Sequence, residues 1–350
     1  MPELGSETRV AIVGAGYFGQ FHFDAWSRIP GVEIVGLAER DPARAAEMAA
    51  RYGRDGTALP VFEDAAEMAE ALAPDLVDIT APPAAHLPLL RALAPRVGHI
   101  ICQKPFCGGL EGARAALALA ETHGTRIAVH ENIRFQPWNR AARRLIDDDR
   151  LGELQQITFR LRPGDGRGPD AYLDRQPYFQ TMPRFLVHET AVHWVDTFRY
   201  LMGDITGVMA RLVRLNPAIA GEDAGVILFD FASGARGLFD GNRLADHAAT
   251  NRRRTMGEML LEGTRATLRL NGDGRLWLRA FGANDEVEHP FVWHDHLFGG
   301  DCVYICSREI LSDWRAGRGS PMEATSYIRN QVVEEAIYES AETGRHLAIP

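Results

Sequence analysis

Residues 10–19 read VAIVGAGYFG and decide the fold of the first half of the chain. Four apolar residues suit a buried strand, and Gly14, Gly16 and Gly19 follow in GxGxxG spacing where a helix is expected to begin. In such a turn the first glycine permits the tight bend, the second lets a pyrophosphate reach the backbone, and the third allows close helix packing. The positive end of the helix favours the phosphate charge. The segment therefore predicts a dinucleotide-binding turn.

The cofactor prediction depends on the next strand-like run, VEIVGLA at 32–38, which ends beside Glu39. This acid stands 20 residues after Gly19, where a carboxylate can bind the adenosine ribose hydroxyls. Glu39 should repel a 2′-phosphate, whereas Arg40 would attract one, so we expect NAD rather than NADP. The expected cofactor contacts are Gly14, Gly16, Tyr17, Phe18, Gly19, Glu39, Arg40 and Gln103.

Composition places the chain among globular proteins. Of its residues, 46% are hydrophobic and 24% are charged, as in ordinary globular proteins. Its length of 350 residues is enough for two domains. The net charge of −9 disfavours nucleic acid and anionic membranes as partners. The first residues show no leader pattern and no long apolar span follows, so we expect a cytoplasmic protein. Four cysteines are too few for a disulfide framework and lack zinc-knuckle spacing, so reduced thiols are expected.

Two domains follow from the order of the predicted elements. Strands and helices alternate through residues 1–130, which predicts a Rossmann α/β domain with a parallel sheet. Residues 131–350 turn to helices followed by many strands, which predicts an α+β domain on an open, mostly antiparallel sheet. Alternating side chains in LLEGTRATLRL predict an exposed sheet face that a second subunit would cover. We therefore expect substrate binding and oligomerisation, as a homodimer or homotetramer, from the second domain.

Lys104 is the only lysine in the chain, which otherwise uses arginine. It lies in Gln103-Lys104-Pro105, directly after a predicted strand that contains Ile100 and Ile101. Ligands of doubly wound sheets bind beyond the carboxyl ends of the strands. Lysine can lose a proton near neutral pH in such a site, whereas arginine cannot. A catalytic role is therefore favoured over a solvated surface lysine.

A second group of reactive side chains lies in LVHETAVHWVDTFRYLMG, residues 186–203, whose apolar spacing predicts an amphipathic helix. Glu189 and His193 are four residues apart, so the carboxylate can orient the imidazole as a proton acceptor. The alternative is a helix-capping glutamate and a structural histidine. A zinc protease is excluded, since His188 and His193 are five residues apart rather than four.

Polar residues elsewhere are expected to contact the substrate. Asn132 and Arg134 follow the last strand of the first domain, and the long loop 162–183 carries further side chains of hydroxyl-binding types. The alternative for the loop residues is a solvated surface. The adjacent His294, Asp295 and His296 lack a third spaced ligand, so no metal site is expected. The loop candidates are Asp170, Tyr172, Asp174 and Gln176.

The ordered set of motifs resembles the Gfo/Idh/MocA oxidoreductases. It comprises the GAGYFG turn, Glu39, QKP in place of the more frequent EKP, HENIRFQP at 130–137 and the closing EEAIYESAETGRHL, and the likeness spans residues 9–349. The resemblance implies the same two-domain fold and NAD(P)-linked oxidation or reduction of sugars and cyclitols. The family's catalytic lysine falls on Lys104. Its Asp-x-x-x-His motif falls on Glu189 and His193, with glutamate in place of aspartate.

Within that family, ICQKP, HEN and LDRQPYF are most similar to branched-pentose dehydrogenases of the D-apiose type. The resemblance implies hydride transfer between nicotinamide and a sugar or polyol carbon. His193 would take the hydroxyl proton while Lys104 stabilises the oxygen, or these two roles would be exchanged. Two alternatives stay open: an NAD-dependent glycosidase on the same fold, and a dinucleotide-sensing regulatory protein that has lost catalysis. The presence of Lys104 and His193 argues against the second.

Overall fold

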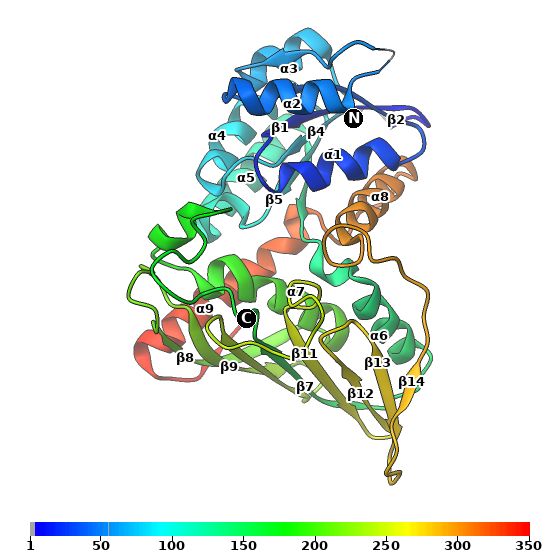
Figure 1. The fold of residues 1–350 in the computed structure, drawn as a ribbon, viewed down its shortest axis with the longest axis vertical. Coiled ribbons are helices and arrows are strands. Elements are labelled where there is room, and N and C mark those ends of the chain that lie inside the picture. The colour runs from blue at the N-terminus through cyan, green and yellow to red at the C-terminus, as the bar shows by residue number, and fades with distance from the viewer. Residues whose placement is uncertain (1–3, 55) are drawn as a thin grey trace. The chain divides into compact units, whose positions relative to one another are not determined.

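The computed structural model describes residues 4–54 and 56–350, which form two compact units (Figure 1). Unit 1 comprises Met1–Asn132 and Val303–Arg329. Unit 2 comprises Ile133–Cys302 and Asn330–Pro350. No helix among the described residues is long and apolar enough to cross a membrane.

Unit 1 is built on a six-stranded parallel sheet in the order β3-β2-β1-β4-β5-β6, which confirms the predicted Rossmann fold. The order in which the strands are added to the sheet reverses between β1 and β4, and sheets of this order bind dinucleotides at that point. The strands are β1 (Thr8–Val13), β2 (Val32–Ala38), β3 (Val61–Phe62), β4 (Leu76–Ile79), β5 (His99–Gln103) and β6 (Arg126–His130). The helices are α1 (Gly19–Arg28), α2 (Pro42–Tyr52), α3 (Ala65–Leu72), α4 (Pro83–Leu93) and α5 (Leu110–His123).

Local signals set the helix ends in unit 1. The Asp41 carboxylate accepts the backbone N–H groups of Ala43 and Arg44 and so caps α2, and Asp64 caps α3 in the same way. Helix α5 ends at Gly124, whose φ of +66° is the left-handed conformation that favours glycine. This glycine explains why α5 stops after His123.

A segment far along the chain also belongs to unit 1. Helix α8 (Cys302–Arg315) and the first turns of α9 (Ala324–Thr343) pack against the parallel sheet. Nε2 of His130 lies 3.1 Å from the Ser307 hydroxyl, and Arg315 donates to the carbonyl oxygen of Gly31 at 2.7 Å. The predicted division into 1–130 and 131–350 therefore needs correction for residues 303–329. A helical pattern shows which face is buried but not which sheet buries it.

Unit 2 holds a nine-stranded sheet in the order β14-β13-β12-β11-β7-β10-β9-β8-β15. Only the β7–β10 pair is parallel among the pairs described, so the predicted open, mostly antiparallel sheet is confirmed. The strands are β7 (Leu154–Leu161), β8 (Ile205–Val213), β9 (Ala224–Phe231), β10 (Arg236–Asn242), β11 (Gly257–Gly263), β12 (Ala266–Leu270), β13 (Leu276–Ala280), β14 (Val287–His289) and β15 (Leu347–Ala348).

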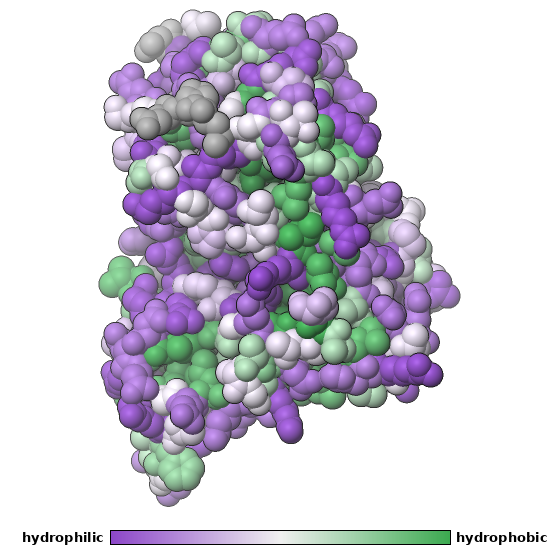
Figure 2. Space-filling view, turned by 180° about the vertical axis from the view of Figure 1, so that it is seen from behind, coloured by the Kyte–Doolittle hydropathy of each residue, from purple (hydrophilic) through white to green (hydrophobic). Residues whose placement is uncertain are grey.

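Helices cover one face of this sheet (Figure 1). Side chains of α6 (Pro137–Asp147), α7 (Val192–Met202) and the second half of α9 join the inward residues of the strands in one apolar core. On β9 the alternate residues Val226 and Leu228 point the other way and are 42% and 49% exposed. Figure 2 shows that hydrophobic residues also reach the surface among hydrophilic ones. The face of the sheet that carries Val226 and Leu228, called the open face below, is therefore only partly polar.

Candidate active site

The glycine turn in unit 1 has the geometry that a dinucleotide needs. Gly14 has a φ of +100°, and a Cβ added there would lie 2.9 Å from the backbone nitrogen of Ala81. A Cβ on Gly19 would lie 3.0 Å from the Gly14 carbonyl oxygen, which explains the close start of α1. A Cβ on Gly16 would meet nothing within 4 Å. Open space therefore lies over the middle of the turn, where the pyrophosphate of a bound cofactor would fit.

Glu39 lies directly at this turn. Its Oε2 accepts the backbone N–H of Ala15 at 2.6 Å, and its Oε1 accepts that of Asp41 at 2.9 Å. The carboxylate is thus held at the end of β2, as ribose recognition requires, while the neighbouring Arg40 is exposed.

Tyr17 and Phe18 lie in the same turn, directly before α1 begins at Gly19. Their rings pack against Phe21, with centroid distances of 5.7 and 5.3 Å. Their predicted contribution to cofactor binding stays a prediction.

Lys104 follows β5 at the carboxyl edge of the parallel sheet, as predicted, and is half-buried. Its backbone N–H donates to Oε1 of Gln103 at 2.8 Å, and the Lys104–Pro105 peptide is cis. Gln103 was expected to contact the cofactor, but its side chain is buried and faces His22 and His130. The predicted cofactor contact of Gln103 stays a prediction, and its amide also has protein partners in this unit.

The predicted helix over 186–203 contains an unpredicted wide turn in unit 2. Residues Leu186–Ala191 form a π-helix, and the α-helix α7 begins only at Val192. Oε1 of Glu222 accepts the backbone N–H groups of Phe185 and Val187 at 3.2 and 3.0 Å, so it caps the widened turn. Single π turns inside helices are frequent at functional sites. The spacing argument used above for His188 and His193 assumed α geometry, which this turn does not have.

Three reactive side chains lie on this π–α segment, and all are buried. Glu189 and His193, the predicted pair, are 7% and 6% exposed, which places both in the interior of unit 2. His188 was not predicted to be a functional residue. Its Nδ1 lies 2.5 Å from Oε1 of Glu334, a buried carboxylate on α9. The sequence held one sign of this pair: Glu334 is an acidic residue among the apolar positions of the last helix, and an acid there needs a buried partner.

Arg134 takes part in a buried ion pair with Asp196, and its role as a substrate contact stays a prediction. Its guanidinium donates twice to the Asp196 carboxylate at 2.5 Å, and Asn330 donates to the same carboxylate at 2.8 Å. The side chain of Asp196 is 1% exposed. A planar guanidinium fits a carboxylate in this two-pronged way, so Arg134 joins α7 to the region before α6.

The loop from 162 to 183 is folded around Tyr172, whose substrate contact also stays a prediction. Tyr172 is 3% exposed, its ring packs on Phe179 and Phe185, and its hydroxyl lies 3.4 Å from Oδ1 of Asp165. Burial raises the pKa of the Tyr172 hydroxyl. The side chain belongs to the interior of the loop because its ring completes an aromatic cluster there.

The remaining predicted substrate contacts differ in exposure. Asp170 and Asp174 are exposed, and Gln176 is half-buried with its amide donating to the Tyr178 hydroxyl at 3.0 Å. Asn132 is buried at the end of unit 1. None of these placements tests a role in substrate binding, so the roles stay predictions.

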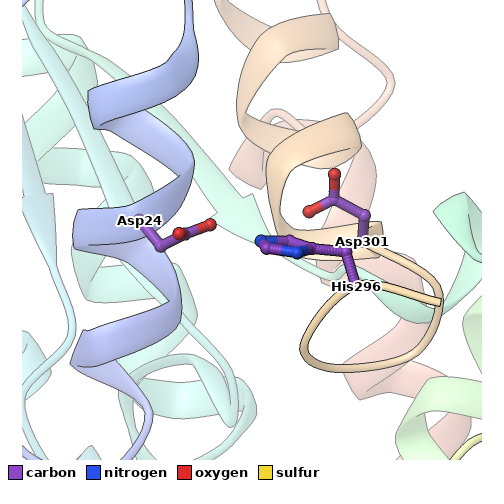
Figure 3. Close-up of side chains that lie close together, drawn as sticks. All are labelled: Asp24, His296 and Asp301. Carbon is purple, nitrogen blue, oxygen red and sulfur yellow. The ribbon is translucent and has the colours of Figure 1, made fainter. Parts of the chain in front are cut away.

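The histidine-rich loop before α8 is held by side-chain and backbone contacts. Arg254 donates to Oδ2 of Asp295 at 2.5 Å, and the backbone N–H of Asp301 donates to the carbonyl oxygen of His296 at 3.1 Å. Figure 3 shows His296 and Asp301 on this loop and Asp24 on α1. The absence of a metal site stays a prediction.

Comparisons with known proteins agree with this geometry. The model of an oxidoreductase family with an NAD-binding Rossmann fold, GFO/IDH/MocA, matches residues 8–131, and the model of the GFO/IDH/MocA C-terminal domain matches residues 139–269. A D-apiose dehydrogenase from Paraburkholderia graminis is 35% identical over 96% of this chain and 88% of its own. An inositol 2-dehydrogenase from Rhizobium meliloti is 28% identical over 70% of this chain and 71% of its own.

A solved structure extends the likeness to three dimensions. An oxidoreductase from Agrobacterium radiobacter, solved in complex with NAD+, L-tartaric acid and magnesium, is 26% identical to this chain. It superposes with a TM-score of 0.85, and the match covers 98% of each chain. Both units of the fold are therefore present in a protein that binds NAD+.

Proposed function

Because the chain belongs to the Gfo/Idh/MocA family of NAD-binding oxidoreductases, we propose that it is an NAD-dependent dehydrogenase that oxidises a hydroxyl of a sugar or polyol. One observation carries the proposal: the only lysine of the chain stands at the carboxyl end of β5, in a sheet with dinucleotide-binding strand order. That edge is where a doubly wound sheet holds its ligands.

The residues of this chain would divide the chemistry as follows. NAD, when bound, supplies the hydride acceptor. The Lys104 ammonium stabilises negative charge on the reacting substrate oxygen, and His193 accepts the hydroxyl proton. Glu189 keeps the imidazole of His193 oriented and balances its charge after proton transfer. The glycine turn and Glu39 hold the pyrophosphate and the adenosine ribose, and the Glu39 carboxylate disfavours NADP.

The D-apiose dehydrogenase likeness supports a branched pentose as the substrate class. Sugars present several hydroxyls, and side chains that donate and accept hydrogen bonds recognise them. Asp170 and Asp174 are exposed on the loop that Tyr172 holds in shape, and Gln176 is half-buried there. We assign these side chains and Asn132 to substrate hydroxyls, and Arg134 and Tyr172 to the support of the surrounding structure.

The open face of the nine-stranded sheet would bind a second copy of the chain. One row of cross-strand partners is mainly apolar, and the next row carries both signs of charge. A twofold axis can then pair the apolar rows and set opposite charges against each other. The apolar row is Met209, Leu228, Leu238, Thr158 and Leu260, and the charged row is Arg211, Val226, Asp240, Arg160 and Glu258.

The experiment is an NADH fluorescence assay of the purified protein with NAD and a panel of aldoses, branched pentoses and inositols. Each active substrate is measured again with Lys104→Met. Activity that this variant loses supports a dehydrogenase and names its substrate class. Glycoside cleavage without NADH accumulation would replace the proposal with a glycosidase, and dinucleotide binding without turnover would favour a regulatory protein.

A further inference from the structure

A layer of buried polar side chains lies under the end of β5 in unit 1. Asp78 of β4, His22 of α1, Gln103 of β5 and His130 of β6 are each at most 5% exposed. Nδ1 of His22 lies 2.7 Å from Oδ2 of Asp78, and Nε2 of Gln103 lies 2.9 Å from Nε2 of His22. The same amide nitrogen lies 3.4 Å from Nδ1 of His130. Gln103, the residue that precedes Lys104, therefore contacts both imidazoles.

The Gln103 amide sets the direction of these hydrogen bonds. Its oxygen accepts the Lys104 backbone N–H at 2.8 Å, so its nitrogen, which only donates, faces the two rings. Nε2 of His22 and Nδ1 of His130 must then accept, and neither carries a proton. His22 keeps its proton on Nδ1, toward Asp78, and His130 keeps its proton on Nε2, 3.1 Å from the Ser307 hydroxyl. Both rings are neutral, in opposite tautomers.

The electrostatics of the layer agrees with a neutral His130 and an ionised Asp78. Burial, together with the adjacent His22, lowers the pKa of His130 to about 3. Burial raises the pKa of Asp78, but contact with His22 and the indole N–H of Trp26, 2.6 Å from Oδ2, outweighs it and leaves the pKa below its usual value. Asp78 is therefore ionised and His130 neutral, and the proton position on His22 follows from its contact with the Gln103 amide nitrogen.

Two further ionisable groups face the layer from neighbouring elements. Burial raises the pKa of the Cys102 thiol on β5, which keeps that group neutral. Glu131 follows His130 and receives a hydrogen bond from the Tyr327 hydroxyl at 3.5 Å.

We propose that Gln103 is a positioning residue for Lys104, which holds the lysine backbone through its amide oxygen and keeps His22 and His130 neutral through its amide nitrogen. The inference rests on the proposed catalytic role of Lys104. A glutamate here could not donate to either ring unless it were protonated. It would therefore bring an additional proton or an additional negative charge into the layer, and a negative charge beside Lys104 would favour the ammonium form.

The first test reads the tautomers of the unaltered protein and needs neither a variant nor turnover. Two-dimensional NMR of ¹⁵N-histidine-labelled protein at pH 7 should show His22 protonated on Nδ1 and His130 protonated on Nε2. His22→Gln and His130→Gln would assign the two signals. A cationic ring at either position, or the opposite tautomer, would overturn the proposal.

The second test uses the fact that Lys104 is the only lysine. Reductive methylation with ¹³C-formaldehyde labels Lys104 and the chain amino terminus, and Lys104→Met identifies the lysine signal. Its NMR titration should give a pKa about one unit higher in Gln103→Glu than in the unaltered protein. Gln103→Met, a neutral control of similar length, should leave that pKa unchanged but lower kcat, since the lysine backbone loses its hydrogen bond.

These outcomes separate the inference from the proposed function. An unchanged lysine pKa in folded Gln103→Glu would overturn the role of Gln103 even if the protein is an active dehydrogenase. A protein without dehydrogenase activity would refute the proposed function, while the tautomers and the titration would still decide what Gln103 does. If Gln103→Glu fails to fold, the tautomers of the unaltered protein decide alone.

Discussion

Oε2 of Glu39 accepts a hydrogen bond from the backbone N–H of Ala15 at 2.6 Å, inside the glycine turn. This contact ties the end of β2 to the turn after β1, two segments whose strands are neighbours in the parallel sheet. The negative charge thus stands beside the path expected for the adenosine ribose. A 2′-phosphate bound there would have to approach a fixed carboxylate.

Glu39→Gln should therefore reduce the preference for NAD over NADP. The amide keeps the shape of the side chain but removes the repulsion, which is worth about 1 kcal/mol at contact distance in water, or roughly fivefold to tenfold in relative affinity. Fluorescence titrations with both dinucleotides measure the two Kd values. NADP binding at least about tenfold more tightly than NAD to the unaltered protein would refute the proposed cofactor preference.

Two substitutions at Lys104 distinguish charge stabilisation from proton transfer. Lys104→Met should lower kcat by roughly 10²- to 10⁴-fold with little change in NAD affinity. Lys104→Arg keeps a positive charge that cannot lose its proton, so it should lose less activity if His193 accepts the proton. Initial rates of NADH formation and NAD titrations give the comparison. An equal loss in both variants would assign the proton transfer to Lys104 itself.

Sequence patterns predicted the parts of the site whose contacts are local or repeat along the chain. The GxGxxG turn and the strand before Lys104 each depend on neighbouring residues, and both are confirmed. Pairs joined over long separations were missed. His188 meets Glu334 across 146 residues, and nothing near either residue identifies the other.

The same reason explains why the ion pair of Arg134 and the π-helix were not predicted. Arg134 was assigned to substrate because a polar residue after a strand is typical of a binding site, but Asp196, 62 residues later, takes its guanidinium. The π-helix was missed because its cap, Glu222, lies 35 residues beyond Val187. Apolar spacing alone does not distinguish a wide turn from an α-helical one.

Arg134→Met should destabilise the protein rather than weaken substrate binding directly. It leaves the buried Asp196 carboxylate without its main partner, a change that costs about 3–5 kcal/mol. Urea denaturation monitored by tryptophan fluorescence measures the free energy of unfolding. Arg143→Met, which breaks an exposed pair with Asp147, serves as the control and should cost less than about 1 kcal/mol. A raised KM with unchanged stability in Arg134→Met would restore the substrate role.

The Asp165 carboxylate should make the stability of unit 2 depend on pH. Burial raises its pKa, but the guanidinium groups of Arg243 and Arg175, at 2.9 and 2.6 Å, outweigh burial and hold the pKa below its usual value. A carboxyl group whose pKa is lower in the folded than in the unfolded protein stabilises the fold at pH values above the unfolded pKa, which is about 3.9. This stabilisation is lost as the pH falls through the pKa of the folded protein.

Asp165→Asn should therefore lower the free energy of unfolding by roughly 3 kcal/mol at pH 7, and by less at pH 3. Urea denaturation at the two pH values measures the difference. Asp147→Asn, at an exposed ion pair, is the control and should change stability little at either pH. An equal loss at both pH values for Asp165→Asn would show that the carboxylate charge contributes nothing.

Leu228→Glu should dissociate the proposed assembly. Leu228 is 49% exposed in the middle of the apolar row on the open sheet face, and a twofold interface would bury two of the new carboxylates in apolar surroundings. Light scattering at micromolar concentration should give at least twice the chain mass for the unaltered protein and 38.7 kDa for the variant. Val292→Glu adds the same charge at a 90% exposed loop residue and should leave the mass unchanged. A monomeric unaltered protein, or an unchanged assembly in Leu228→Glu, would remove this face from the interface.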